Sequence, residues 1–86
     1  MKYLLIFNDI RGDRTNQFIY GTDIASIRRQ VVAILHNRSK GAYGALVTDR
    51  KLELVGQIYA EDGHWYYKTP VGKPFRIGTS GRRIKG

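Results

Sequence analysis

The alternation of apolar and polar positions divides the chain into one helical segment between two groups of short extended segments. Residues 2–8 form a short apolar run of strand-forming side chains, which is typical of a buried strand. Residues 10–16 are polar and contain glycine, which predicts a loop. Residues 17–20 are again strand-forming, so we expect the chain to begin with a hairpin of two strands.

The clearest predicted element is an amphipathic helix at about residues 23–39. Thr22 or Asp23 is a suitable N-cap, because either side chain accepts a hydrogen bond from a free N–H of the first turn. Gly41 is suited to a left-handed helix stop. Arg28 lies at the margin of the apolar face, where we expect its stem to pack. That face is expected to cover the sheet and contains Ile24, Ile27, Val31, Ile34 and Leu35.

The pattern after Gly41 changes from helical to strand-like. Three strands are predicted: 42–48, 52–60 and 64–69. The turn between the last two contains Asp62-Gly63, a pair that favours the tight turns of antiparallel hairpins. Consecutive hairpins of this kind indicate an antiparallel meander.

The last part of the chain begins with a loop that is bracketed by Pro70 and Pro74. Residues 75–77 predict a short final strand, and residues 78–86 are small, polar and basic, which predicts a mobile C-terminal tail. The expected fold is a single α+β domain over residues 1–77, with one helix packed on a mostly antiparallel sheet. The order is ββαβββ, with the short strand as a sixth, and the sheet face away from the helix is open to a partner.

Length and composition exclude several classes of protein. Eighty-six residues suit one domain, and a hydrophobic fraction of 42% is enough for one core. The absence of cysteine excludes disulfides and thiolate metal sites and fits a reducing cytoplasm. The apolar run at the start is too short for a signal peptide, and no segment reaches the roughly 20 apolar residues of a membrane helix. We expect a cytoplasmic protein with no membrane partner.

Positive charge is concentrated near the C-terminus. The net charge is +8, of which residues 1–63 carry +2 and residues 64–86 carry +6, because the latter segment contains six Lys and Arg residues and no acid. Charge of one sign gathered in this way attracts polyanions, of which nucleic acid is the commonest in a cell. Solubility alone is the alternative explanation.

The most informative segment is the aromatic strand at residues 64–68. Alternation sends Trp65 and Tyr67 to one face of this strand, where they can fill the core. His64, Tyr66 and Lys68 then face the opposite way, and a ring beside a cation resembles surfaces on which bases stack and phosphates are held. The ordinary preference of tyrosine and tryptophan for strands is the alternative explanation.

We therefore predict a surface that binds DNA or RNA and combines this sheet face with the later cations. Lys73 and Arg76 are expected to contact phosphates, and the C-terminal cations up to Lys85 are expected to follow as an arm. Such contacts make the affinity fall steeply with salt. The predicted nucleic-acid contacts are Tyr66, Lys68, Lys73, Arg76, Arg82 and Arg83. Ordinary solvated charge is the alternative for the arm.

The sequence contains no clear catalytic centre or metal site. Acid–base catalysis needs a second group within hydrogen-bond reach of a histidine. One such arrangement is an alternative function: an RNA-cleaving centre formed by His64 with Glu61 and Lys68. The carboxylates occur mainly at predicted turns and without the spacing of a calcium loop. We expect a non-enzymatic protein that needs no cofactor and no metal.

One short resemblance bears on this prediction. Residues 63–68 are similar to strands in the small DNA-binding domains that tyrosine recombinases use on arm-type sites. Those domains place the helix after the strands, so no function is transferred from six residues. The short, basic, cysteine-free chain also resembles accessory proteins of bacteriophages and mobile elements. The alternative function is therefore a protein-interaction module that docks on a host complex, or self-associates, through an exposed strand or sheet face.

Overall fold

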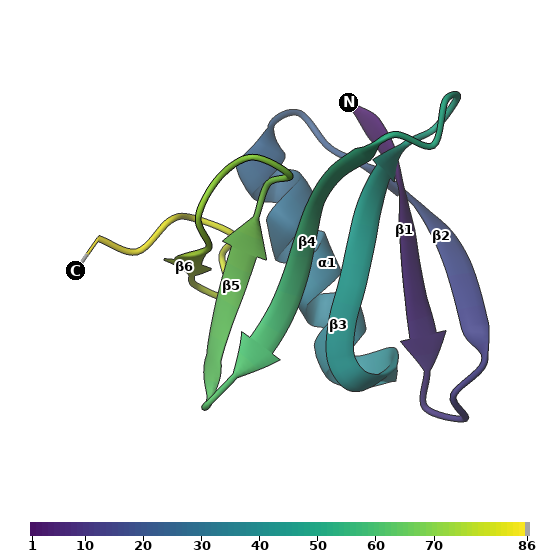
Figure 1. Cartoon of the computed structure of the whole chain (residues 1–86), viewed down its shortest axis with the longest axis horizontal. Coiled ribbons are helices and arrows are strands. Elements are labelled where there is room, and N and C mark those ends of the chain that lie inside the picture. Colours follow the sequence, from purple (N-terminus) through teal and green to yellow (C-terminus); the bar gives the residue numbers. More distant parts are fainter. Residues whose placement is uncertain (86) are drawn as a thin grey trace.

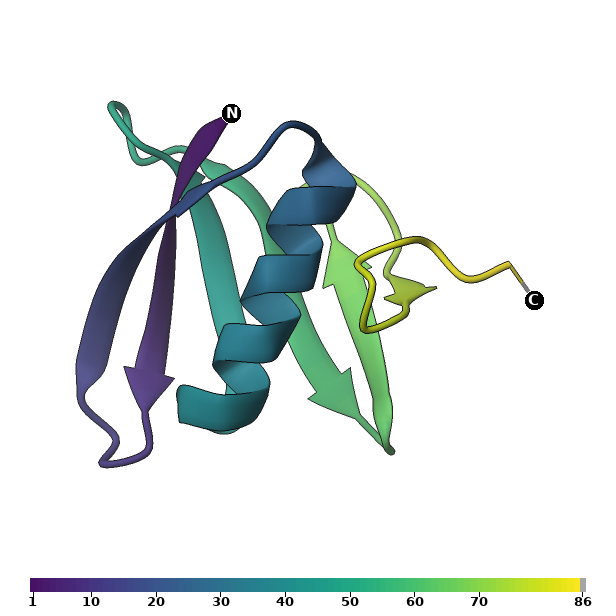
Figure 2. The same cartoon turned by 180° about the vertical axis from the view of Figure 1, so that it is seen from behind.

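The computed structural model describes residues 1–85, which form one α-helix and one six-stranded antiparallel sheet (Figures 1 and 2). The elements in chain order are β1 (Lys2–Asp9), β2 (Arg14–Tyr20), α1 (Ile24–Arg38), β3 (Ser39–Thr48), β4 (Leu54–Glu61), β5 (His64–Lys68) and β6 (Phe75–Ile77). This confirms the predicted α+β class and the short final strand. No helix within the described part of the chain is long and apolar enough to cross a membrane.

The helix carries the chain from one edge of the sheet to its middle. The strand order is β2-β1-β3-β4-β5-β6, so β3 pairs with β1 on the side away from β2. Figure 2 shows α1 lying across one face of the sheet. In Figure 1 the sheet lies in front of α1, and its opposite face is not crossed by another segment. We call this opposite face the open face.

The core lies between α1 and the covered face of the sheet. The predicted apolar face of the helix is confirmed: Ile27, Val31 and Leu35 are fully buried, and Ile24 and Ile34 pack against them at the margin. Burial of large aliphatic side chains of this kind contributes roughly 1.5–3 kcal/mol each. The buried partners from the strands are Leu5, Phe7, Ile19, Leu46, Ile58, Tyr67 and Ile77.

Two features that short stretches of sequence predict are present in the structure: the N-cap of α1 and the turn between β4 and β5. The carboxylate of Asp23 caps α1 and accepts a hydrogen bond from the backbone N–H of Ser26 at 2.8 Å. Asp62 and Gly63 have positive φ angles of 52° and 79°, which is the pattern of a two-residue hairpin turn between β4 and β5. Both features depend on residues within a few positions of each other.

Gly41 has a different role from the predicted one. The helix ends at Arg38, and its C-cap Ser39 is already extended. Gly41 and Ala42 have positive φ angles of 84° and 49° inside β3, near the point where the register between β3 and β1 shifts. The left-handed conformation of Gly41 therefore permits an irregularity in the strand, where a residue with a side chain would be strained.

The C-terminal segment differs from the expected mobile tail. Residues 78–84 reverse direction and return beside β6, where Arg83 forms a bridge with Ile77. The N–H of Ile84 donates to the carbonyl of Arg76 at 2.9 Å, and the N–H of Gly78 donates to the carbonyl of Arg82 at 3.0 Å. These contacts extend the packed part of the chain beyond residue 77. The final residue of the predicted tail, residue 86, lies outside the described residues.

Gly81 explains why this segment can reach the helix. It has a φ of +82°, and a Cβ at this position would overlap the backbone of Ala25 and Arg29 in α1. Only glycine allows the segment to approach so closely. The side chain of Arg28 completes the contact, since its Nε donates to the carbonyl of Gly81 at 2.7 Å.

Candidate nucleic-acid interface

A line of aromatic side chains crosses the open face from strand to strand. Tyr43 of β3 lies opposite Tyr59 of β4, and Tyr59 lies opposite Tyr66 of β5. The rings of Tyr59 and Tyr66 stack with 5.6 Å between centroids and 19° between planes. Tyr66 in turn lies opposite Arg76 of β6. We call Tyr43, Tyr59 and Tyr66 the tyrosine row.

A shallow hollow lies between the tyrosine row and the edge of the sheet at β2. Arg14 of β2 lies opposite Asn8 of β1, and both border this hollow together with Tyr43. Its volume is about 330 Å³, and its full lining is Ile6, Phe7, Asn8, Arg14, Tyr43 and Ala45. The tyrosine row is therefore flanked by an arginine on each edge strand, Arg14 on one side and Arg76 on the other.

The middle residue of the tyrosine row, Tyr59, is favoured in its neutral form. Partial burial raises the pKa of the Tyr59 hydroxyl, and the neighbouring Glu61 and Tyr66 raise it further. Tyr43 is 46% exposed, so its ring is accessible from solvent. Neutral rings on an accessible sheet surface can stack with any base, because each base has a π face.

A second aromatic group occupies the far end of the open face. The Nζ of Lys2 lies 4.4 Å from the ring centroid of Phe18 and 5.6 Å from that of Tyr20. Both rings are about half exposed, at 49% and 60%. Lys2 also pairs with Asp49 at 3.9 Å, so its charge is partly compensated. This group therefore offers less positive potential than the region around Arg76.

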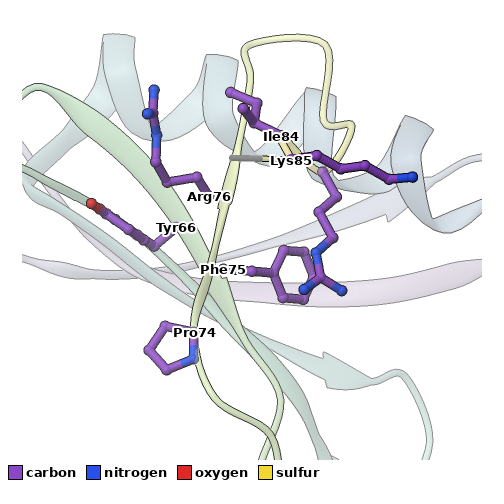
Figure 3. A pocket seen from close by; sticks show the side chains of 7 residues that line it. Tyr66, Pro74, Phe75, Arg76, Ile84 and Lys85 are labelled. Atoms are coloured by element: carbon purple, nitrogen blue, oxygen red, sulfur yellow. The ribbon is translucent and has the colours of Figure 1, made fainter.

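A cleft of about 590 Å³ lies beside β6 at the edge of the sheet (Figure 3). Its lining is Tyr66, Pro74, Phe75, Arg76, Arg83, Ile84 and Lys85, which includes three cations and no carboxylate. In Figure 3, Tyr66 and Arg76 lie on one side of β6, whereas Phe75 and Lys85 lie on the other. The guanidinium carbon of Arg83 lies 4.4 Å from the Phe75 ring centroid, which holds this cation at the cleft. We call this feature the β6 cleft.

The structure brings some of the predicted contacts together and separates others. Tyr66, Arg76 and Arg83 border the β6 cleft. Lys68 lies on the open face opposite Gln57 of β4. Its Nζ donates to the carbonyl of the next residue at 3.2 Å. Lys73 is exposed in the loop before β6.

Arg82 lies away from this surface. It borders a separate hollow at the start of α1, together with Ser80, Ser26 and Arg29. The cause is the turn at residues 78–81, after which adjacent side chains of the returning segment point to opposite sides. The expected arm therefore divides: Arg83 lies against Phe75 at the β6 cleft, and Arg82 lies beside the first turns of α1.

The side chain of Arg28 packs beside the β6 cleft, against Tyr67 and Phe75. As predicted from its position at the margin of the helix, its side chain packs inward, with its guanidinium carbon 5.1 Å from the Tyr67 ring centroid and 5.7 Å from that of Phe75. Burial lowers the pKa of Arg28, whereas Tyr67 and Asp23 act in the opposite direction. Phe75 thus lies close to two guanidinium groups, those of Arg28 and Arg83.

The residues of the catalytic alternative do not converge. Glu61 and His64 are partners across the exposed hairpin turn. Lys68 lies on the same face as His64 but about 13 Å further along β5, at roughly 3.3 Å per residue. Within residues 1–85, no group of three or more His, Asp or Glu side chains is placed to hold a metal ion.

Tyr66 is the one open-face aromatic residue among the contacts predicted from the sequence. Tyr43, Tyr59, Phe18 and Tyr20 all follow from the alternation within their own strands. The alternation does not predict the register between strands, which places Tyr59 beside Tyr66 and Tyr43 beside Tyr59. Register depends on pairing between distant strands, so it becomes visible only in the folded sheet.

The fold and this surface define a one-helix antiparallel α+β domain with an aromatic and basic sheet face. In the comparisons with known proteins, no family model, no curated protein and no solved structure matches the chain.

Proposed function

We propose that this domain is a non-enzymatic cytoplasmic protein that binds nucleic acid through the open face of its sheet. The tyrosine row supports this proposal best. Its rings lie on three adjacent strands, which are spaced about 4.8 Å apart, so they form a continuous aromatic surface that bases can contact. Arg14 and Arg76 flank the row and are suited to bind phosphates.

The charge distribution supports the same proposal. The chain carries a net charge of +8, and residues 1–85 contain one salt bridge, between Lys2 and Asp49. The cations near the tyrosine row thus keep their charge uncompensated by contact with a carboxylate. If about four of them bind phosphates of a single strand, the logarithm of the affinity should fall with the logarithm of salt concentration with a slope of about −3.

The test is a fluorescence-anisotropy titration of generic DNA and RNA oligonucleotides at low and moderate salt. We expect measurable binding at low salt that weakens with the stated slope. Tyr43→Ala should weaken it by roughly fivefold or more, because stacking contributes about 1–3 kcal/mol per base. Tyr20→Ala is the matched control, since it removes an exposed ring from the same face outside the tyrosine row. Absence of binding at low salt would refute the proposal.

A protein-interaction function is the second candidate, because the two edges of the sheet differ. The edge at β6 is covered by the returning C-terminal segment. The edge at β2 pairs with β1 over seven uninterrupted positions, contains neither proline nor lysine, and carries the exposed Phe18 and Tyr20. An edge of this kind can pair with a strand of a second chain. Size-exclusion chromatography with light scattering distinguishes this candidate, since it requires a defined oligomer or a host-protein complex free of nucleic acid.

A further inference from the structure

We infer that the β6 cleft binds a short unpaired stretch of a nucleic-acid strand that crosses the edge of the sheet at β6. One base would lie against Tyr66 with a phosphate at Arg76, and a neighbouring phosphate would lie at Arg83 and Lys85 on the other side of β6. This inference rests on the proposed function and narrows it, because it makes the ligand a single strand. A duplex keeps its bases stacked and paired inside, so it cannot present a base to the ring of Tyr66.

The ring of Tyr66 lines the β6 cleft and is partly exposed. Tyr59 stacks against this ring, with 5.6 Å between the centroids and nearly parallel planes. The cleft lies on the side of β6, where Tyr66 forms part of the wall beside Pro74. A base that enters here contacts the ring of Tyr66 beside Arg76. Proline and tyrosine together provide the flat apolar surface that a base requires.

The cations of the cleft are placed to bind phosphates on both sides of β6. Arg76, Arg83 and Lys85 border the cleft, and no carboxylate does. The planar guanidinium of arginine donates two parallel hydrogen bonds to phosphate oxygens, which favours this ligand over a simple anion without matching geometry. The volume of about 590 Å³ lies within the usual 300–1,000 Å³ of small-ligand sites. One or two nucleotides of a single strand fit this volume, whereas a duplex does not.

Arg83 is held in place before any ligand arrives. Its backbone bridges Ile77, and the following N–H, that of Ile84, donates to the carbonyl of Arg76 at 2.9 Å. Its guanidinium lies 4.4 Å from the centroid of the Phe75 ring. A side chain that is fixed in this way loses less conformational entropy on binding, which favours a built site over a chance cluster of surface charge.

The experiment compares four probes by anisotropy or competition: a short single-stranded oligonucleotide, the matched duplex, a free nucleoside monophosphate and inorganic polyphosphate. We expect the single strand to bind at least about tenfold more tightly than the other three. Tyr66→Leu should weaken single-strand binding by roughly 5- to 100-fold and leave polyphosphate binding nearly unchanged. Arg83→Gln should weaken it more than Arg50→Gln, which removes the same charge from the exposed turn after β3.

Each failure has a distinct meaning. Equal affinity for single strand and duplex would overturn the inference and leave the proposed function standing. Equal affinity for the free nucleotide would also overturn it, because the ligand would then be a small molecule and not a strand. If no nucleic acid binds at low salt, both the inference and the proposed function fail. Circular dichroism of each variant confirms that a lost affinity does not reflect a lost fold.

Discussion

Replacement of Gly81 by alanine should detach the C-terminal segment from α1. The new Cβ would lie 2.5 Å from the backbone nitrogen of Arg29 and would overlap the carbonyl oxygen of Ala25. Because both neighbours are helix backbone, neither can move aside without breaking α1. The residue would also keep a φ of +82°, which is unfavourable for any side chain.

The magnitude follows from these two costs. A left-handed conformation costs a non-glycine residue about 1 kcal/mol, and forcing an extra carbon into a packed contact costs about 1–3 kcal/mol. We therefore expect Gly81→Ala to lower the free energy of unfolding by about 3 kcal/mol. For a domain of this size, that is a fall of roughly 12–24 °C in Tm. Gly12→Ala is the matched control, since Gly12 has a similar φ of +87° but a Cβ added there would meet no atom within 4 Å.

Thermal unfolding and limited trypsin digestion measure the two effects separately. Gly12→Ala should lose about 1 kcal/mol through backbone strain alone. Gly81→Ala should lose more, and trypsin should cleave it rapidly after Arg82 and Arg83, because the segment that contains them is released. Equal stability of the two variants, with equally slow cleavage, would refute the close approach of Gly81 to α1.

Three further predictions concern side chains around the same core. Arg28→Met should cost about 1.5–3 kcal/mol in thermal unfolding, because the charged hydrogen bond to the carbonyl of Gly81 is lost; an unchanged Tm would contradict this role. Asp23→Ala should cost about 1 kcal/mol by the same measurement, because the N–H of Ser26 loses its acceptor, and a neutral result would argue against the cap. Burial raises the pKa of the Tyr67 hydroxyl, with Arg28 partly opposing the change. The unfolded chain therefore releases this proton first, and stability should decline as the pH rises above about 10. Tyr67→Phe should decline less steeply in denaturant titrations across this range, and an identical slope would contradict the assignment.

Much of the fold could be predicted because its signals are local. The helix follows from the spacing of Ile27, Val31 and Leu35 and from the cap at Asp23, all within a few turns. The Asp62-Gly63 turn is also specified by two adjacent residues. The placement of β3 beside β1 has no such local signal, because it depends on how α1 crosses the sheet.

The candidate site also combines residues whose positions are predictable from the local sequence with residues whose positions are not. Alternation alone places Tyr66 and Lys68 on the open face, and Arg76 follows once β6 pairs with β5. The directions of Arg82 and Arg83 depend on the turn at residues 78–81 and on its contact with α1, which composition does not reveal. A small, polar and basic sequence is typical of a mobile tail, but its glycines also permit close packing.

Chemical-shift mapping by NMR would show where nucleic acid contacts this domain. On addition of a short single-stranded oligonucleotide at low salt, we expect the largest shifts at Tyr43, Tyr59 and Tyr66 and around the β6 cleft. Residues on the exposed side of α1 should remain unchanged. Shifts confined to α1, or no shifts at all, would contradict binding through the open face.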